Sequence, residues 1–206
     1  ITARCTNEDL YVFQKFMRSV IGTNHLDSSA RYGHLNFVRA MKHALGLHRM
    51  MNTSEEINKA KAVLIIGANI TETNPVASLR VKSAMGLYKA QTIVVDSMQT
   101  NIAKLASHPM MVNPGTEGLY IQGLVKSVID QDLIDEEATS AFPEALDSLR
   151  QAVGLFSLED IANQTGVDLK HILEAARIFA EASRSIIICG EGILRNAGGY
   201  QHMLNL

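Results

Sequence analysis

Residues 61–76 read KAVLIIGANITETNPV, and this stretch decides the fold class. The letters VLII at 63–66 form a short apolar run rich in β-branched side chains, which is typical of a strand covered on both faces. The run ends at Gly67, a polar loop follows, and Pro75 is placed where it can begin a helix. The stretch therefore predicts a buried strand, a loop and a helix, which is one unit of an α/β fold.

The same layout recurs at 92–100 (TIVVDSMQT) and at 186–192 (IIICGEG), and a weaker third strand is expected at 110–112. Strands that alternate with helices predict a mostly parallel, Rossmann-like sheet flanked by helices. No linker divides residues 1–206, so we expect one α/β domain in which 135–182 is mainly helical. The expected helices cover 8–21, 36–45, 75–87, 100–106, 117–131, 143–153, 157–164 and 168–182.

Composition and charge exclude several classes of protein. The chain has 206 residues, 47% hydrophobic and 19% charged, so it can form a sizeable core. A net charge of −2 without a basic cluster argues against nucleic-acid binding, and no apolar run approaches the roughly 20 residues of a membrane span. Cys5 and Cys189 form no metal-ligand pattern and are expected to be small, buried apolar residues with reduced thiols. These features predict a cytoplasmic protein.

Candidate binding residues follow the predicted strands. Ligands of open α/β sheets bind at the carboxyl ends of the strands, where glycines admit a close approach and polar side chains supply hydrogen bonds. The alternative for each position is ordinary turn or helix-cap chemistry. The candidates are Gly67, Asn69 and Glu72 after the first strand, Asp96 after the second, Gly115 and Glu117 before a helix, and Gly190 and Gly192 after the last strand.

Arg31 and His34 lie together in a polar stretch between two predicted helices. A histidine beside an arginine can transfer a proton or bind an anion, and the alternative is a surface or packing role. The remaining histidines show no HExxH spacing, so no metal ligand is predicted. The absence of GxGxxG argues against an ordinary NAD-binding domain.

Taken in order, several segments resemble the molybdopterin oxidoreductase family, which includes formate dehydrogenases, nitrate reductases and the large iron–sulfur subunit of NADH-quinone oxidoreductase (complex I). The segments span nearly the whole chain in the family's order. They are ARCTNEDLYVFQKF (3–16), GTNHLDSSARYGH (22–34), VLIIGANITETNPV (63–76), IVVDSMQT (93–100), NPGTEGLYIQGL (113–124) and IIICGEG (186–192).

The resemblance implies a formate dehydrogenase/DMSO reductase-like fold and a role for each loop. In active relatives, loops of this type contact a molybdopterin guanine dinucleotide. The loop with Gly67, Asn69 and Glu72 and the loop with Gly190 and Gly192 would contact the cofactor. Residues 96–98 correspond to the family's DPR-like loop and 114–117 to its PGTD, both near the guanosine end.

Two positions depart from the family's pattern. Formate dehydrogenases place a cysteine or selenocysteine that ligates the metal where this chain has Gly33, which has no side chain to bind a soft metal. Arg31 and His34, which flank the metal in active relatives, are retained. The arginine of the DPR-like loop is replaced by Met98, which removes a donor that could bind a phosphate.

Two functions follow from this pattern. In the first, the chain is the central domain of a subunit like the large iron–sulfur subunit of complex I, where it supports electron transfer from NADH to quinone through iron–sulfur clusters that lie outside it. In the second, it is the cofactor-binding part of a molybdenum or tungsten oxidoreductase such as formate dehydrogenase, with Arg31 and His34 acting on the substrate or a proton. Both functions imply partner subunits of a redox complex, which could hold the protein at the inner membrane. Because the sequence starts at Ile1, we expect a fragment of a longer chain.

Overall fold

Four parallel strands form one sheet in the computed structural model, which describes residues 1–2, 5–47, 52–140, 143–196 and 198–205. The sheet has the strand order β3-β2-β1-β4, so the strand of the 61–76 stretch lies inside it. In the register, Ile66 lies between Val95 on one side and Cys189 on the other. The predicted parallel α/β fold is therefore confirmed. The strands are β1 (Ala62–Ile66), β2 (Gln91–Asp96), β3 (His108–Met111) and β4 (Ser185–Cys189).

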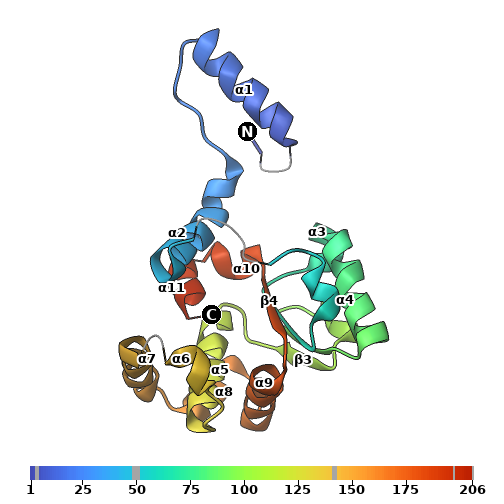
Figure 1. The fold of residues 1–206 in the computed structure, drawn as a ribbon, viewed down its shortest axis with the longest axis vertical. Helices are drawn as coiled ribbons and strands as arrows, with labels where there is room; N and C mark the ends of the chain where they lie inside the picture. Colours follow the sequence, from blue (N-terminus) through green and yellow to red (C-terminus); the bar gives the residue numbers. More distant parts are fainter. Residues whose placement is uncertain (3–4, 48–51, 141–142, 197, 206) are drawn as a thin grey trace.

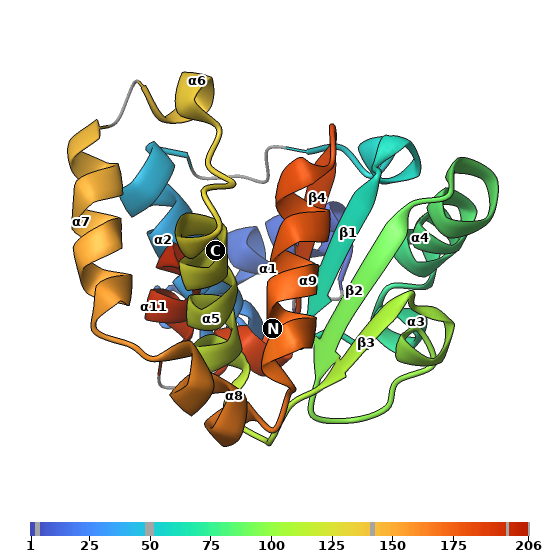
Figure 2. The same ribbon diagram turned by 90° about the horizontal axis from the view of Figure 1, so that it is seen from below.

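Helices cover both faces of the sheet, as Figure 2 shows. One face packs against α4 (Pro75–Tyr88), and the other packs against α5 (Glu117–Asp130), α8 (Leu158–Thr165) and α9 (Leu169–Glu181). Side chains of β1 alternate between two core clusters, with Leu64 and Ile66 toward α5 and Val63 and Ile65 toward α4. All five residues of β1 are buried, which explains why its sequence is continuously apolar.

The remaining elements are short or lie away from the sheet. They are α2 (His34–Leu45), α3 (Ile70–Thr73), α6 (Glu136–Thr139), α7 (Pro143–Gly154), α10 (Glu191–Leu194), α11 (Gly199–Leu204), and the 3₁₀ turns η1 (Ser29–Tyr32), η2 (Glu56–Lys59) and η3 (Ala103–Leu105). Helices α2 and α11 pack side by side although they lie at opposite ends of the sequence (Figure 1).

Several predicted boundaries were wrong. The stretch expected to be a loop up to residue 34 contains η1, and α2 begins at His34 rather than at 36. Strand β3 covers His108–Met111 instead of 110–112, because its pairing with β2 starts where His108 meets Ile93. The helix expected at 100–106 is only the 3₁₀ turn η3. A hydrogen bond from the Ala103 amide to Thr100 Oγ1 precedes this turn.

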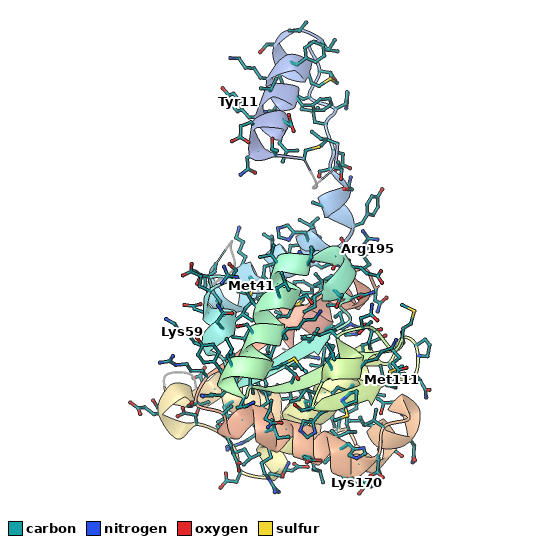
Figure 3. The ribbon with its side chains drawn as sticks, turned by 90° about the vertical axis from the view of Figure 1, so that its right-hand side faces the viewer. Tyr11, Met41, Lys59, Met111, Lys170 and Arg195 are labelled. Carbon is teal, nitrogen blue, oxygen red and sulfur yellow. The ribbon has the colours of Figure 1, made fainter. Side chains whose placement is uncertain are left out.

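The first helix, α1 (Asn7–Ser19), stands apart from the rest of the structure (Figure 1). Its sequence has an apolar face, yet it contains no buried residue. Tyr11 is 59% exposed and points away from the body of the protein in Figure 3. The helix owes its start to a local signal, because the Thr6 hydroxyl accepts a hydrogen bond from the Asp9 amide at 3.2 Å.

Candidate functional site

The loops that follow β1 and β4 are joined backbone to backbone. The Gly190 amide donates to Ile66 O at 2.9 Å, and the Gly192 amide donates to Gly67 O at 3.1 Å. A methyl group on Gly190 would overlap with Gly67 O and with Ala68 Cα. Gly67 has a φ of +57°, in the left-handed region that favours glycine. These three glycines are therefore explained by the close packing of two strand ends.

Residues 190–192 are expected to form a glycine loop, but Gly190 is the N-cap residue of the short helix α10 (Glu191–Leu194), which contains Gly192. The reason is local hydrogen bonding, because the Leu194 amide bonds back to Gly190 O at 3.4 Å and the Arg195 amide to Glu191 O at 2.9 Å. Only Gly190 and Gly192 therefore remain at the carboxyl edge of β4.

Asp96 ends β2, directly beside the start of the Gly67 loop. The Gly67 amide donates to Val95 O at 2.9 Å, which fixes the loop against β2. Asp96 Oδ1 accepts a hydrogen bond from the Met98 amide at 3.0 Å, so one carboxylate oxygen stabilises the turn after the strand. Asp96 therefore stabilises a turn, which was one of the two roles that the sequence allowed. Its side chain is half-buried at the carboxyl edge of the sheet.

Asn69 and Glu72 differ in their surroundings although they share one loop. The Asn69 carbonyl accepts the Glu72 amide at 3.1 Å, which begins α3. Asn69 Oδ1 is buried and has no hydrogen-bond partner among the described residues. Glu72 is exposed to solvent. Asn69 therefore presents an unsatisfied acceptor, whereas Glu72 needs no partner.

Glu117 is the most unusual side chain of the predicted set. It occupies the first turn of α5, where the helix dipole favours a negative charge, and it is only 7% exposed. Its Oε2 atom is buried and has no hydrogen-bond partner among the described residues. Gly115, in the turn just before the helix, has a φ of +84° and is exposed. A buried carboxylate oxygen without a donor is costly, so this atom fits a ligand that donates hydrogen bonds.

Sequence reasoning missed His202, which α11 places against the backbone of α5. A side chain on Gly118 or Gly198 would collide with the His202 ring, so the two glycines create its space. Burial lowers the pKa of His202, and the charge of Glu117 acts in the opposite direction. Its Nδ1 atom is buried and unpaired among the described residues. The glycine directly after Glu117 inside a helix is the one signal in the sequence that could have indicated this close contact.

Arg31 lies in η1 and His34 begins α2, and both side chains are exposed. Arg31 Nη1 forms an ion pair with Asp27 Oδ2 at 2.7 Å, and this hydrogen bond holds the pKa of the Asp27 carboxyl below its usual value. The His34 ring stacks on Phe37 with 5.8 Å between the ring centroids.

The segment around Gly33 contacts α10, the short helix that follows Gly190. A Cβ atom on the buried Gly33 would lie 3.4 Å from Arg195 Cγ, and Asn36 Nδ2 donates to Leu194 O at 2.8 Å. Figure 3 shows Arg195 at the end of the body from which the chain leads to α1. The tertiary structure thus brings Gly33 and the start of α2 beside the end of α10, although the two are far apart in sequence.

The described residues show no group of three or more histidine, cysteine, aspartate or glutamate side chains that could hold a metal ion. None of the helices in the described part of the chain is both long and apolar enough to span a membrane. Two of the predicted site residues, Asn69 and Glu117, thus each have a buried acceptor oxygen without a hydrogen-bond partner among the described residues.

Comparisons with known proteins agree on one family. The family model described as molybdopterin oxidoreductase matches residues 1–205. The F420-dependent formate dehydrogenase subunit alpha of Methanocaldococcus jannaschii is 34% identical over 198 residues, which are 96% of this chain and 29% of that protein. The NADPH-Fe(3+) oxidoreductase subunit alpha of Geobacter sulfurreducens is 32% identical over 98% of this chain and 24% of that protein. The chain therefore spans about a quarter to a third of the length of these relatives.

Among solved structures, acetylene hydratase from Pelobacter acetylenicus has the same fold, with a TM-score of 0.74 and 19% identity over 93% of this chain and 26% of that one. Formate dehydrogenase H of Escherichia coli is 28% identical in sequence over 97% of this chain and 28% of that protein. These relatives favour the second of the two functions derived from the sequence over the complex I-like one. The match over residues 1–205 shows that the chain belongs to the molybdopterin oxidoreductase family.

Proposed function

We propose that this chain holds the guanine end of a molybdopterin guanine dinucleotide in a molybdenum or tungsten oxidoreductase of the formate dehydrogenase type. The observation that carries the proposal is Glu117, a carboxylate that is 7% exposed and has a buried, unpaired Oε2 atom. The N–H groups of guanine are hydrogen-bond donors, and a carboxylate only accepts. Glu117 therefore offers the acceptor that a guanine edge would use.

Other residues along the same edge support a polar ligand. Asn69 Oδ1 is a second buried acceptor without a partner among the described residues, and it follows β1 directly. Gly67, Gly190 and Gly192 keep the two strand-end loops close together, so that their backbone forms a rigid support. Rigid elements hold binding groups more precisely than mobile loops do. When bound, the cofactor would supply the redox chemistry, and the protein would supply its binding and orientation.

Two residues, one in η1 and one at the start of α2, would act beside the reacting part of such a cofactor. Arg31 and His34 are exposed, so both can reach a substrate, and a histidine side chain is a suitable group to transfer a proton to or from it. Gly33, between them in sequence, supplies no thiolate, and a metal would need its ligands from elsewhere. Because the relatives are named as alpha subunits, we include further subunits of a redox complex in the proposal.

Metal and pterin analysis of the full-length protein from its native host tests this proposal. We expect stoichiometric molybdenum or tungsten, and guanosine monophosphate after acid hydrolysis of the cofactor. Intact iron–sulfur clusters without molybdenum, tungsten or pterin would refute the proposal and would favour the complex I-like function. Two features of the sequence support that second function, namely the missing side chain at Gly33 and Met98 in place of the arginine.

A matched pair of variants tests the role of Glu117. A hydrogen bond to a charged group contributes about 1.5–3 kcal/mol, so Glu117→Gln should lower the affinity for the dinucleotide by roughly 10-fold or more. Glu174→Gln, on an exposed position of α9, removes the same charge away from the edge and should leave the cofactor content unchanged. Equal cofactor content in both variants would exclude Glu117 as the guanine contact.

A further inference from the structure

A basic hollow lies between α2 and α11, and neither the predicted site nor the proposed function uses it. It has a volume of about 560 Å³ and is lined by Arg39, Lys42, His43 and Tyr200. The first three side chains come from one face of α2, at positions i, i+3 and i+4, and Tyr200 comes from α11. The packing of the two helices brings these residues together across more than 150 positions of the sequence.

The two helices that form this hollow supply no acidic side chain to it. Helix α2 contains no aspartate or glutamate, and neither does α11. Within the described ranges, Arg39 and Lys42 take part in no ion pair. The C-terminal end of a helix favours cations, which accounts for Lys42 and His43 in the last turn of α2. This preference explains neither the position of Arg39, one turn earlier, nor the hydrogen bond between His43 and Tyr200.

His43 and Tyr200 form a preorganised pair at the hollow. His43 Nδ1 and the Tyr200 hydroxyl are 2.5 Å apart, and the planes of the two rings differ by only 5°. With the tyrosine hydroxyl as donor to Nδ1, the imidazole carries its hydrogen on Nε2, which becomes a second fixed donor. Holding both rings in one orientation removes part of the entropy cost that a ligand would otherwise face.

We infer that Arg39, Lys42, His43 and Tyr200 form a binding site for a phosphate group, either free or as the monoester of a small metabolite. Two permanent positive charges match the charge of about −1.5 to −2 that a phosphate monoester carries at pH 7. The guanidinium of Arg39 and the ammonium of Lys42 together offer more hydrogen-bond donors than the two oxygens of a carboxylate can accept. A phosphate group has three terminal oxygens, so it matches these donors better than a carboxylate does. The volume falls within the 300–1,000 Å³ that is usual for small-molecule sites, so it can also admit the organic part of an ester.

Calorimetric titration of the full-length protein with inorganic phosphate tests the site. We expect one saturable binding event per chain that weakens with added NaCl and is competed by sulfate. The double variant Arg39→Gln/Lys42→Gln should weaken phosphate binding by at least 10-fold. The control Lys104→Gln/Arg184→Gln removes the same two charge types from exposed positions of η3 and of the segment before β4, and it should change binding less than twofold.

Three further measurements complete the test. Tyr200→Phe should weaken binding while leaving the melting temperature within a degree, because it removes one hydroxyl at a half-exposed position. Acetate that binds as tightly as phosphate, or equal losses in the two double variants, would overturn the assignment. A glycerol phosphate that binds more tightly than inorganic phosphate would identify an ester as the ligand, and the reverse order would identify the free ion. Since phosphate binding is measured without reference to pterin or metal content, its outcome is independent of the proposed cofactor role.

Discussion

The Gly192 amide donates a 3.1 Å hydrogen bond to the carbonyl oxygen of Gly67, which ties the end of β4 to the end of β1. A Cβ atom on Gly192 would lie 2.9 Å from that same oxygen. The two loops that the sequence singles out as cofactor contacts therefore first make contact with each other. Their glycines are required by the protein's own backbone, whatever ligand binds above them.

Gly190→Ala should destabilise the protein strongly. The added methyl group would overlap with backbone atoms of Gly67 and Ala68, and neither strand end can move without breaking sheet hydrogen bonds. We expect a loss of about 2 kcal/mol or more in the free energy of unfolding, measured by urea denaturation. Gly86→Ala is the control, because Gly86 is exposed inside α4 with open space around its Cα atom. It should stabilise by roughly 0.5–1 kcal/mol, since alanine is the better helix former.

Cys189 and Cys5 should react with thiol reagents at different rates. Burial raises the pKa of the Cys189 thiol from 9.0 to about 12, so this cysteine stays protonated and unreactive at pH 8. The sequence predicts that both cysteines are buried, and in the structure both are partly buried. Labelling with a thiol-specific chromogenic reagent should modify Cys5 in the native protein and Cys189 only after unfolding. Rapid labelling of Cys189 in the folded protein would contradict this account.

The raised pKa of Cys189 also predicts a dependence of stability on pH. A thiol whose pKa is higher in the folded than in the unfolded state stabilises the fold below the unfolded value, and this contribution is lost between pH 9 and about pH 12. Cys189→Ser should flatten the fall in melting temperature over that interval. An unchanged slope would show that other groups dominate.

Tyr120→Phe should be tolerated or mildly stabilising. The Tyr120 hydroxyl is fully buried, and it has no hydrogen-bond partner within the described ranges. Removing an unsatisfied buried hydroxyl returns about 1 kcal/mol, which thermal unfolding at pH 7 can detect. Burial also raises the pKa of Tyr120 above its usual 10.0, so the variant should unfold less readily above pH 10. Tyr11→Phe, at an exposed position of α1, should change neither property.

Glu117→Gln should lower the pKa of His202 further. Burial already lowers this pKa from 6.5, and the negative charge of Glu117 is the first effect that opposes it. Titration of the imidazole by NMR should therefore show a lower midpoint in the variant than in the natural protein. Because the folded state prefers the neutral ring, stability should fall as the pH drops below 6.5, and His202→Phe should reduce that dependence. An unchanged midpoint in Glu117→Gln would show that the charge of Glu117 does not act on His202.

The sequence by itself determined most of the sheet and the residues that follow its strands. The apolar runs at 63–66, 92–95 and 185–189 predicted three of the four strands, because a strand covered by helices on both faces must be apolar throughout. The positions of Gly67, Asp96 and Gly190 at strand ends followed from the same pattern. The fourth strand, β3, was expected only weakly and with wrong bounds, because it exposes half of its residues and carries no continuous apolar run.

Only the tertiary structure decided which of the polar residues are unsatisfied and which are merely part of turns. The burial of Glu117 beside His202 depends on α11 crossing the start of α5, and the basic hollow depends on α11 packing against α2. These contacts join residues that lie far apart in the chain, and local periodicity carries no information about such pairs. The exposed apolar face of α1 has the same origin, because an amphipathic pattern specifies a helix that can be buried but not whether a neighbour covers it.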